Sequence, residues 1–113
     1  AKAYYNRGYA KDELKDYYGA ISDYTKAIEI NPQYADAYGN RGYAKEKLND
    51  DYAAISDYTK AIELDPYNAN AYKNRSISKE KIGDLKGACV DAKKAVSLGD
   101  KDSNNISWIK NIC

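Results

Sequence analysis

The stretch YYNRGYAK, Tyr4 to Lys11, returns as YGNRGYAK at Tyr38 to Lys45 and as YKNRSISK at Tyr72 to Lys79. Each copy begins 34 residues after the one before it. Laid over each other without a gap, residues 1–34 and 35–68 are identical at 23 positions, and residues 35–68 and 69–102 at 14. Self-similarity at a fixed period of this length is typical of repeat proteins, in which each unit buries its apolar face against its neighbours.

Each repeat contains two segments with a helical pattern. The first segments cover residues 2–14, 36–48 and 70–82, and the second cover 17–30, 51–64 and 85–98. An aspartate that can cap the free N–H groups precedes each second segment: Asp16, Asp50 and Asp84. Pro32 and Pro66 follow two of the second segments, and a proline disfavours helix at the residue before it. The pattern predicts three antiparallel helical hairpins that stack.

The last segment, residues 103–113, indicates a seventh helix. Ser103 can cap it, and Ile106, Ile109 and Ile112 form its apolar stripe. We expect this helix to cover the exposed end of the third hairpin. The predicted fold is an all-α, right-handed α-solenoid in a single domain, residues 1–113, with repeats 1–34, 35–68 and 69–102 and a capping helix 103–113.

Composition excludes several classes of function. Lys and Arg number 18 against 17 Asp and Glu, so no overall charge draws the chain to nucleic acid or to an anionic membrane. There is no histidine, no set of metal ligands and no glycine-rich phosphate loop. Asp100, Asp102 and Asn104 are spaced as in a calcium loop, but the glycine and glutamate that such a loop needs are absent. We therefore expect no enzyme activity, no cofactor, no metal, no nucleic acid and no membrane partner.

The repeat resembles the tetratricopeptide repeat (TPR) family. The resemblance is carried by aromatic residues, small residues and prolines at family positions: Tyr4, Tyr38, Tyr72; Gly8, Gly42, Ser76; Ala20, Ala54, Ala88; Tyr24, Tyr58; Ala27, Ala61, Ala95; Pro32, Pro66. It implies a superhelix whose first helices line a concave groove. It also implies a protein–protein interaction module or scaffold that binds a peptide segment of a partner in that groove.

Three arginines stand where this family commonly has leucine, within the packed face of the first helices. Burying an unpaired charge is costly, so each needs an acid. The second helices repeat an aspartate at the matching position, which predicts structural ion pairs across each hairpin: Arg7–Asp23, Arg41–Asp57 and Arg75–Asp91. The alternative is that the arginines bind an anionic ligand.

The remaining face of the first helices supplies the candidate groove residues: Lys2, Tyr5, Asn6, Tyr9, Asp36, Asn40, Tyr43, Lys47, Asn70, Lys73, Asn74, Ile77 and Lys81. By resemblance, the asparagine ladder of Asn6, Asn40 and Asn74 grips the backbone of a bound peptide, since an amide both donates and accepts. The asparagines could instead bond to the neighbouring helix. Likewise, Tyr5, Tyr9, Tyr43 and Ile77 either form apolar pockets for a ligand or pack between first helices.

Some members of the family hold acidic C-termini in a two-carboxylate clamp. Of the matching positions, Tyr5, Tyr9, Asn40, Asn70 and Asn74, only Asn40 has the expected side chain. We therefore expect a mixed or fairly neutral peptide. Two alternatives from other classes remain: a structural segment that self-associates through its repeat ends, and an RNA-binding helical repeat, although the chain lacks a basic stripe.

Cys89 and Cys113 leave two outcomes open. If the capping helix folds back, the sulfurs could form a disulfide that closes a loop; otherwise Cys89 is a buried free thiol and Cys113 a frayed terminal one. Similar spacing in bacterial TPR proteins favours the bond by resemblance. A disulfide would indicate a periplasmic or exported protein, and free cysteines a cytoplasmic one.

Overall fold

The structure is a computed structural model that describes all 113 residues. It contains seven helices and no strand: α1 (Lys2–Glu13), α2 (Tyr17–Ile30), α3 (Ala35–Lys47), α4 (Asp51–Leu64), α5 (Ala69–Lys81), α6 (Leu85–Ser97) and α7 (Ser103–Ile112). Every helix end lies within one residue of its predicted position. None of the helices has the length and apolar character needed to cross a bilayer.

The turns inside the three hairpins share the same capping hydrogen bond and the same backbone conformation. Asp16, Asp50 and Asp84 each accept a hydrogen bond from the backbone N–H three residues later, as predicted. The residue before each cap has a positive φ: Lys15 at 62°, Asn49 at 63° and Gly83 at 89°. Only the third hairpin places a glycine there, where a left-handed backbone carries no steric penalty.

The predicted cap of α7 is wrong. Ser103 is the first residue of the helix, and the carboxylate of Asp102 accepts from the N–H of Asn104 at 2.9 Å. Asp102 has an extended backbone, with φ −62° and ψ 113°, which is the conformation that an N-cap requires. The side chain of Asp100 accepts from the N–H of Asp102 and from the amide of Asn105, so these oxygens stabilise the turn.

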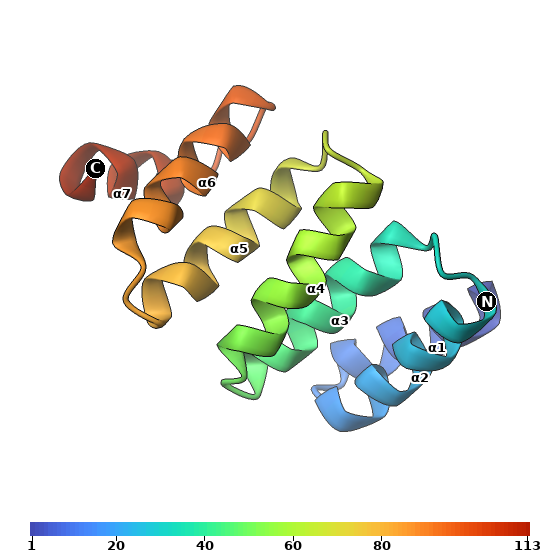
Figure 1. The fold of residues 1–113 in the computed structure, drawn as a ribbon. Helices are drawn as coiled ribbons and strands as arrows, with labels where there is room; N and C mark the ends of the chain where they lie inside the picture. Colours follow the sequence, from blue (N-terminus) through green and yellow to red (C-terminus); the bar gives the residue numbers. More distant parts are fainter.

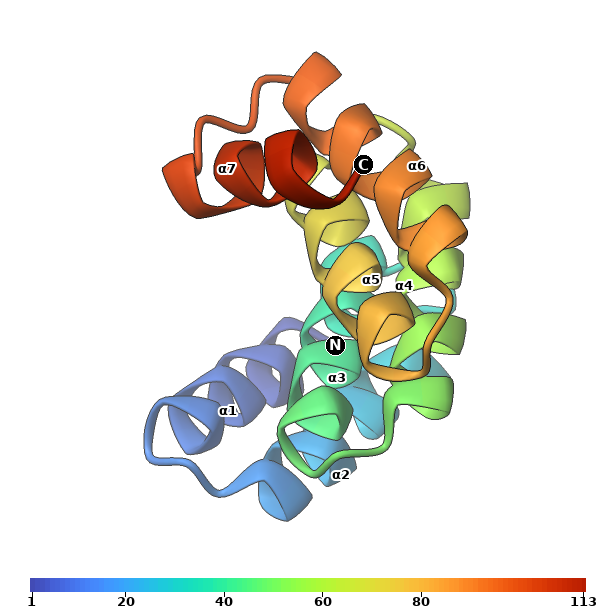
Figure 2. The same cartoon turned by 90° about the vertical axis from the view of Figure 1, so that its left-hand side faces the viewer.

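The hairpins α1–α2, α3–α4 and α5–α6 stack in chain order, with α2 packed on α3 and α4 on α5 (Figure 1). The result is a right-handed α-solenoid that measures 41 × 25 × 21 Å. Figure 2 shows its curvature: α1 and α7 are the two arms of a bent molecule, with α3 and α5 between them and the second helices on the outer side.

The core of the first two hairpins pairs a glycine with a tyrosine. A Cβ atom on Gly8 would lie 2.9 Å from the Tyr24 ring, and one on Gly42 would lie 2.9 Å from the Tyr58 ring. Both tyrosines are fully buried, and burial raises the pKa of each hydroxyl. The third hairpin replaces this pair with Ser76 and Ala92, and the Ser76 hydroxyl donates to the carbonyl of Ala88. The small serine therefore accompanies the loss of the large ring.

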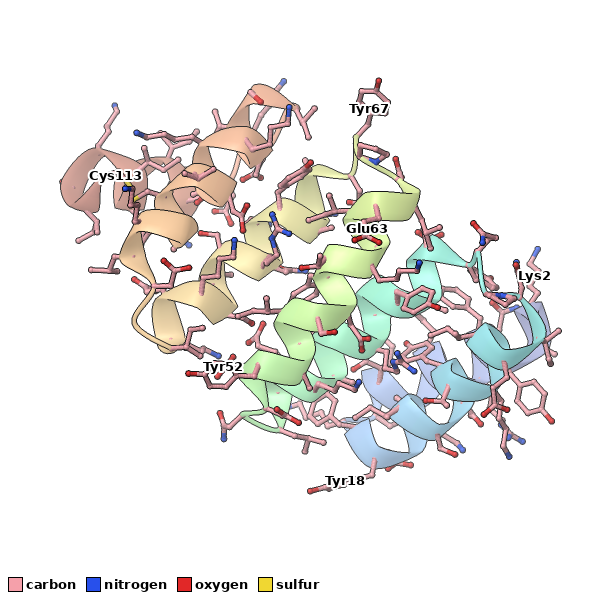
Figure 3. The ribbon with its side chains drawn as sticks, viewed as in Figure 1. Lys2, Tyr18, Tyr52, Glu63, Tyr67 and Cys113 are labelled. Atoms are coloured by element: carbon pink, nitrogen blue, oxygen red, sulfur yellow. A yellow bond between two sulfur atoms is a disulfide. The ribbon has the colours of Figure 1, made fainter.

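A disulfide joins Cys89 in α6 to Cys113 at the end of α7, with the two Cα atoms 5.8 Å apart. Figure 3 shows Cys113 beside α6 with its sulfur drawn in yellow. Of the two outcomes that the sequence leaves open, the structure has the bonded one. The bond fastens the last turn of α7 to the third hairpin.

Candidate functional site

Each of the three hairpins contains the same cluster of charges, in which an arginine and a lysine of the first helix contact an aspartate of the second. Arg7 donates through Nε and Nη2 to both carboxylate oxygens of Asp23, each at 2.8 Å. Lys11, one turn later, places its Nζ 3.1 Å from Asp23 Oδ2. The second and third hairpins repeat this geometry with Arg41, Lys45 and Asp57, and with Arg75, Lys79 and Asp91, at 2.7–3.0 Å.

The aspartates at these clusters are buried, whereas the cations reach toward solvent. Asp23 is 1% exposed, and the hydrogen bond from Arg7 holds the pKa of its carboxyl at about 2. Two nitrogens of each arginine are occupied in planar, two-point pairing with an internal acid. This geometry favours the structural ion pairs over the alternative of an anionic ligand.

Helices α1, α3 and α5 lie on the inner side of the curve (Figure 2), and all the candidate groove residues belong to these three helices. We call it the concave face and define it by the thirteen candidate residues named above. Hydrogen bonds join its successive helices. Asn40 of α3 donates to the hydroxyl of Tyr5 of α1 at 2.9 Å, and Lys81 of α5 lies 2.9 Å from Glu46 of α3.

Tyr5 and Asn40 are used in packing between the first two hairpins. The ring of Tyr5 stacks on that of Tyr34 at 5.0 Å and is tilted against Tyr24 at 5.7 Å. Burial raises the pKa of the Tyr5 hydroxyl, which accepts the hydrogen bond from Asn40. For these two residues the structure has the contact with the neighbouring helix that the sequence leaves open.

Other members of the concave face remain available. Lys2, Asn6, Tyr9, Asp36 and Asn70 are exposed. Asn74 is half-buried, and its side chain has no hydrogen-bond partner, nor has that of Asn6. Among the lysines, Lys47 lies over the ring of Tyr43 at 5.0 Å, Lys81 pairs with Glu46, and Lys73 lies 3.6 Å from Asp102.

A cavity of about 180 Å³ lies between α5 and α7. Its apolar walls are Ile77, which is 39% exposed, and Trp108. Polar groups complete the lining: Lys73, Ser76, Glu80, Asp102, Asn104 and Asn105. The indole N–H of Trp108 donates to Glu80 at 2.6 Å and so fixes the ring at the cavity wall. No cation pairs with Glu80.

Trp108 was missed as a candidate by sequence reasoning, which assigned all of α7 to capping. The signal was present in the repeat register, because residue 108 follows Asn74 by one period of 34. Trp108 thus stands where a fourth ladder asparagine would stand. Its proximity to Ile77 and Glu80 depends on the docking of α7, which the register does not specify.

Comparison with known proteins agrees with this architecture. The sequence profile of the tetratricopeptide repeat matches residues 1–34 and 35–68. A search among curated protein sequences found no match. Among solved structures, the Arabidopsis OM64 TPR domain is 29% identical, with a TM-score of 0.94 over 98% of this chain and 92% of that one.

Two further structures are similar. MamA is 30% identical, with a TM-score of 0.84 over 91% of this chain and 60% of that one. The first TPR of Spaghetti (RPAP3), bound to the HSP90 peptide SRMEEVD, is 23% identical, with a TM-score of 0.93 over 97% of this chain and 87% of that one. With three stacked hairpins, a covering helix and a profile match over its first two repeats, this chain belongs to the tetratricopeptide repeat family.

Proposed function

We propose that this protein is a non-catalytic adaptor that binds an extended peptide segment of a partner protein along its concave face. The observation that carries the proposal is the cavity between α5 and α7. Two of its lining residues, Lys73 and Ile77, are predicted groove residues. The cavity combines the apolar walls of Ile77 and Trp108 with a polar rim. An apolar pocket surrounded by polar groups is the usual anchor site for a side chain of a bound peptide.

The free amides of the concave face supply the second part of the proposal. Asn74 lies one turn before Ile77 on α5, so a peptide anchored in the cavity passes close to its unpartnered side chain. Asn6 offers a second free amide at the other end of the face. Asn40 has already donated to Tyr5, which leaves its carbonyl oxygen as an acceptor for a peptide N–H.

The charges of the concave face favour a ligand of mixed or low charge. Lys73 and Lys81 are engaged by Asp102 and Glu46, so they do not form a free cationic patch. Tyr5, Tyr9 and Asn70 occupy positions where a two-carboxylate clamp needs other side chains. We therefore expect the acidic peptide SRMEEVD, which the similar TPR of Spaghetti binds, to have no saturable binding to this chain.

The test is a selection of random twelve-residue peptides on the immobilised protein, followed by titration of the selected peptides in solution. Trp108 is the only tryptophan of the chain, so its fluorescence reports directly on the cavity. We expect the selected peptides to shift this fluorescence. The substitution Asn74→Ala should weaken their binding about fivefold, the equivalent of one hydrogen bond of about 1 kcal/mol.

A matched pair of variants completes the experiment. Ile77→Glu places a charge in the cavity, while Val90→Glu places the same charge on an apolar residue of α6 that is 62% exposed and outside the concave face. Binding should be lost with Ile77→Glu and kept with Val90→Glu. Peptides that bind both variants equally well would contradict the proposal.

A further inference from the structure

The cavity between α5 and α7 carries a negative charge that no cation of the chain neutralises. Its lining contains one lysine, Lys73, and two carboxylates, those of Asp102 and Glu80. Lys73 lies 3.6 Å from Asp102, so these two charges offset each other. The only side-chain partner of Glu80 is the uncharged indole of Trp108. The lining therefore has an excess of one negative charge, and it belongs to Glu80.

The lysines on either side of Glu80 in α5 are engaged by other acids. Lys79 lies 2.9 Å from Asp91, and Lys81 lies 2.9 Å from Glu46. An exposed glutamate without a cation is common on protein surfaces, where water solvates it, so the charge of Glu80 alone does not make a binding site. What distinguishes this glutamate is the group that holds it at a cavity.

That group is the indole of Trp108. Its N–H donates to Oε2 of Glu80 at 2.6 Å, which orients the carboxylate and leaves Oε1 as a free acceptor. The half-buried Trp108 ring lines the cavity together with Ile77. An aromatic ring attracts a cation through the negative charge of its π-face, and an apolar wall receives the alkyl stem of a long basic side chain. Ring, carboxylate and wall thus favour the same kind of ligand group.

We propose that the cavity between α5 and α7 binds the basic side chain of a lysine or arginine in the partner's peptide. The inference rests on the proposed peptide-binding function and names the residue that anchors the peptide. The alkyl stem of the anchor packs on Ile77, and its charged end lies beside the Trp108 ring and donates to Oε1 of Glu80. The amide of Asn74, one turn before Ile77, then lies close to the peptide backbone next to the anchor.

An acidic anchor does not fit this cavity. It would meet the unpaired carboxylate of Glu80, and the one cation of the lining, Lys73, is already engaged by Asp102. The substitution Ile77→Glu does not create a better site for a cation. It removes the apolar wall, and the new carboxylate lies one turn from Lys73, which neutralises it. The loss of binding expected for that variant therefore holds for a basic anchor as well.

The test exchanges the charge on both sides of the contact. We expect the peptides selected on the full chain to share one lysine or arginine. Its neutral analogue, citrulline for arginine or acetyl-lysine for lysine, should bind the natural chain about tenfold more weakly, because the ion pair and the contact with the ring are both lost. On Glu80→Gln, which keeps an oxygen for the Trp108 N–H, the same exchange should cost only about threefold. Fluorescence anisotropy of dye-labelled peptides measures all four affinities.

A matched control and two distinct outcomes decide the result. Glu29→Gln removes the same charge from an exposed residue of α2, outside the concave face, and should keep the tenfold preference for the charged peptide. Selected peptides without a shared basic residue, or an equal preference on the natural chain and on Glu80→Gln, would overturn the basic anchor. The proposed function would survive either result, because peptides would still bind. If no peptide binds, both proposals are wrong.

Discussion

The repeats at the two ends of the stack have different surroundings. At the N-terminal end, Arg7 keeps one nitrogen without a partner and more than half of its side chain in solvent. At the C-terminal end, α7 lies over α6, Trp108 and Asp102 contact α5, and a disulfide fastens the last turn. Within residues 1–113, the first end leaves Arg7 open to solvent, and the other end is closed by a helix of a different sequence.

The comparison shows how much of a residue's role depends on its neighbours. Arg7 and Arg41 have the same sequence context and the same pairing with an aspartate. Only Arg41 is enclosed by a preceding hairpin, so only its pair is removed from water on both sides. Burial strengthens the dependence of each charge on its partner, because an uncompensated buried charge is far more costly than an exposed one.

The largest expected effect comes from removing the acid of an enclosed cluster. Asp57→Ala leaves Arg41 and Lys45 without their shared partner, and we expect a loss of about 3–5 kcal/mol in the free energy of unfolding. Asp23→Ala leaves Arg7 and Lys11, which reach water more easily, so its loss should be about 1 kcal/mol. Urea denaturation measures both. Equal losses would show that the preceding hairpin contributes nothing to the cluster.

The closed end should depend on its disulfide. Its cysteines are separated by 24 residues, and a loop of that length corresponds to about 3 kcal/mol of stability. Reduction, or the variant Cys113→Ser, should release α7 first and speed hydrogen exchange there, while α1 and α2 keep their protection. Exchange that rises equally in all seven helices would contradict a local role for the bond.

The second and third hairpins differ at one pair of core positions, Gly42 with Tyr58 and Ser76 with Ala92. Gly42→Ser places a side chain against the Tyr58 ring, and we expect a loss of about 2 kcal/mol in unfolding free energy from overpacking. When Tyr58→Ala is already present, as in the Ser76–Ala92 pair of the third hairpin, the added cost of Gly42→Ser should fall close to zero. Thermal or urea unfolding of the double-mutant cycle checks this, and additive costs would refute the coupling.

The smallest effect is a pH dependence at the open end. Pairing with Arg7 lowers the pKa of Asp23 from 3.8 to about 2, so this carboxylate stabilises the fold above pH 4. The contribution is lost as the pH falls from about 4 to 2. It amounts to about 1 kcal/mol once the screening by the solvent around Arg7 is considered. The stability gap between the natural chain and Asp23→Asn should close over this range, and a gap constant down to pH 2 would argue against it.

Most of the fold could be predicted from the sequence because the same pattern of helices and turns occurs in three repeats. The period of 34, the capping aspartates and the prolines placed every helix end within one residue. The Arg–Asp pairing followed from charge and repeat position together, since arginines on a packed face need acids at a matching position. The cap of α7 was predicted wrongly because Asp102 and Ser103 are both good capping residues, and only the backbone conformation distinguishes them.

The candidate site was less predictable, because its residues act across helices. Whether Asn40 faces a ligand or Tyr5, and whether Trp108 meets Ile77, depends on how hairpins approach one another. A sequence pattern indicates which residues share a face of a helix, but it does not indicate which helix packs against that face. The asparagine ladder stays a prediction for Asn6 and Asn74, which have no internal partner.

The amino-acid sequence by itself determined the helices, their pairing into three hairpins and the acid that each arginine needs, because these follow from local periodicity and from the cost of burying charge. Only the tertiary structure decided which copy of a repeated residue is enclosed, that Asn40 bonds to Tyr5, and that Cys89 and Cys113 meet. The physical reason is that burial depends on what packs against a residue. Identical repeats acquire different roles from their positions in the stack.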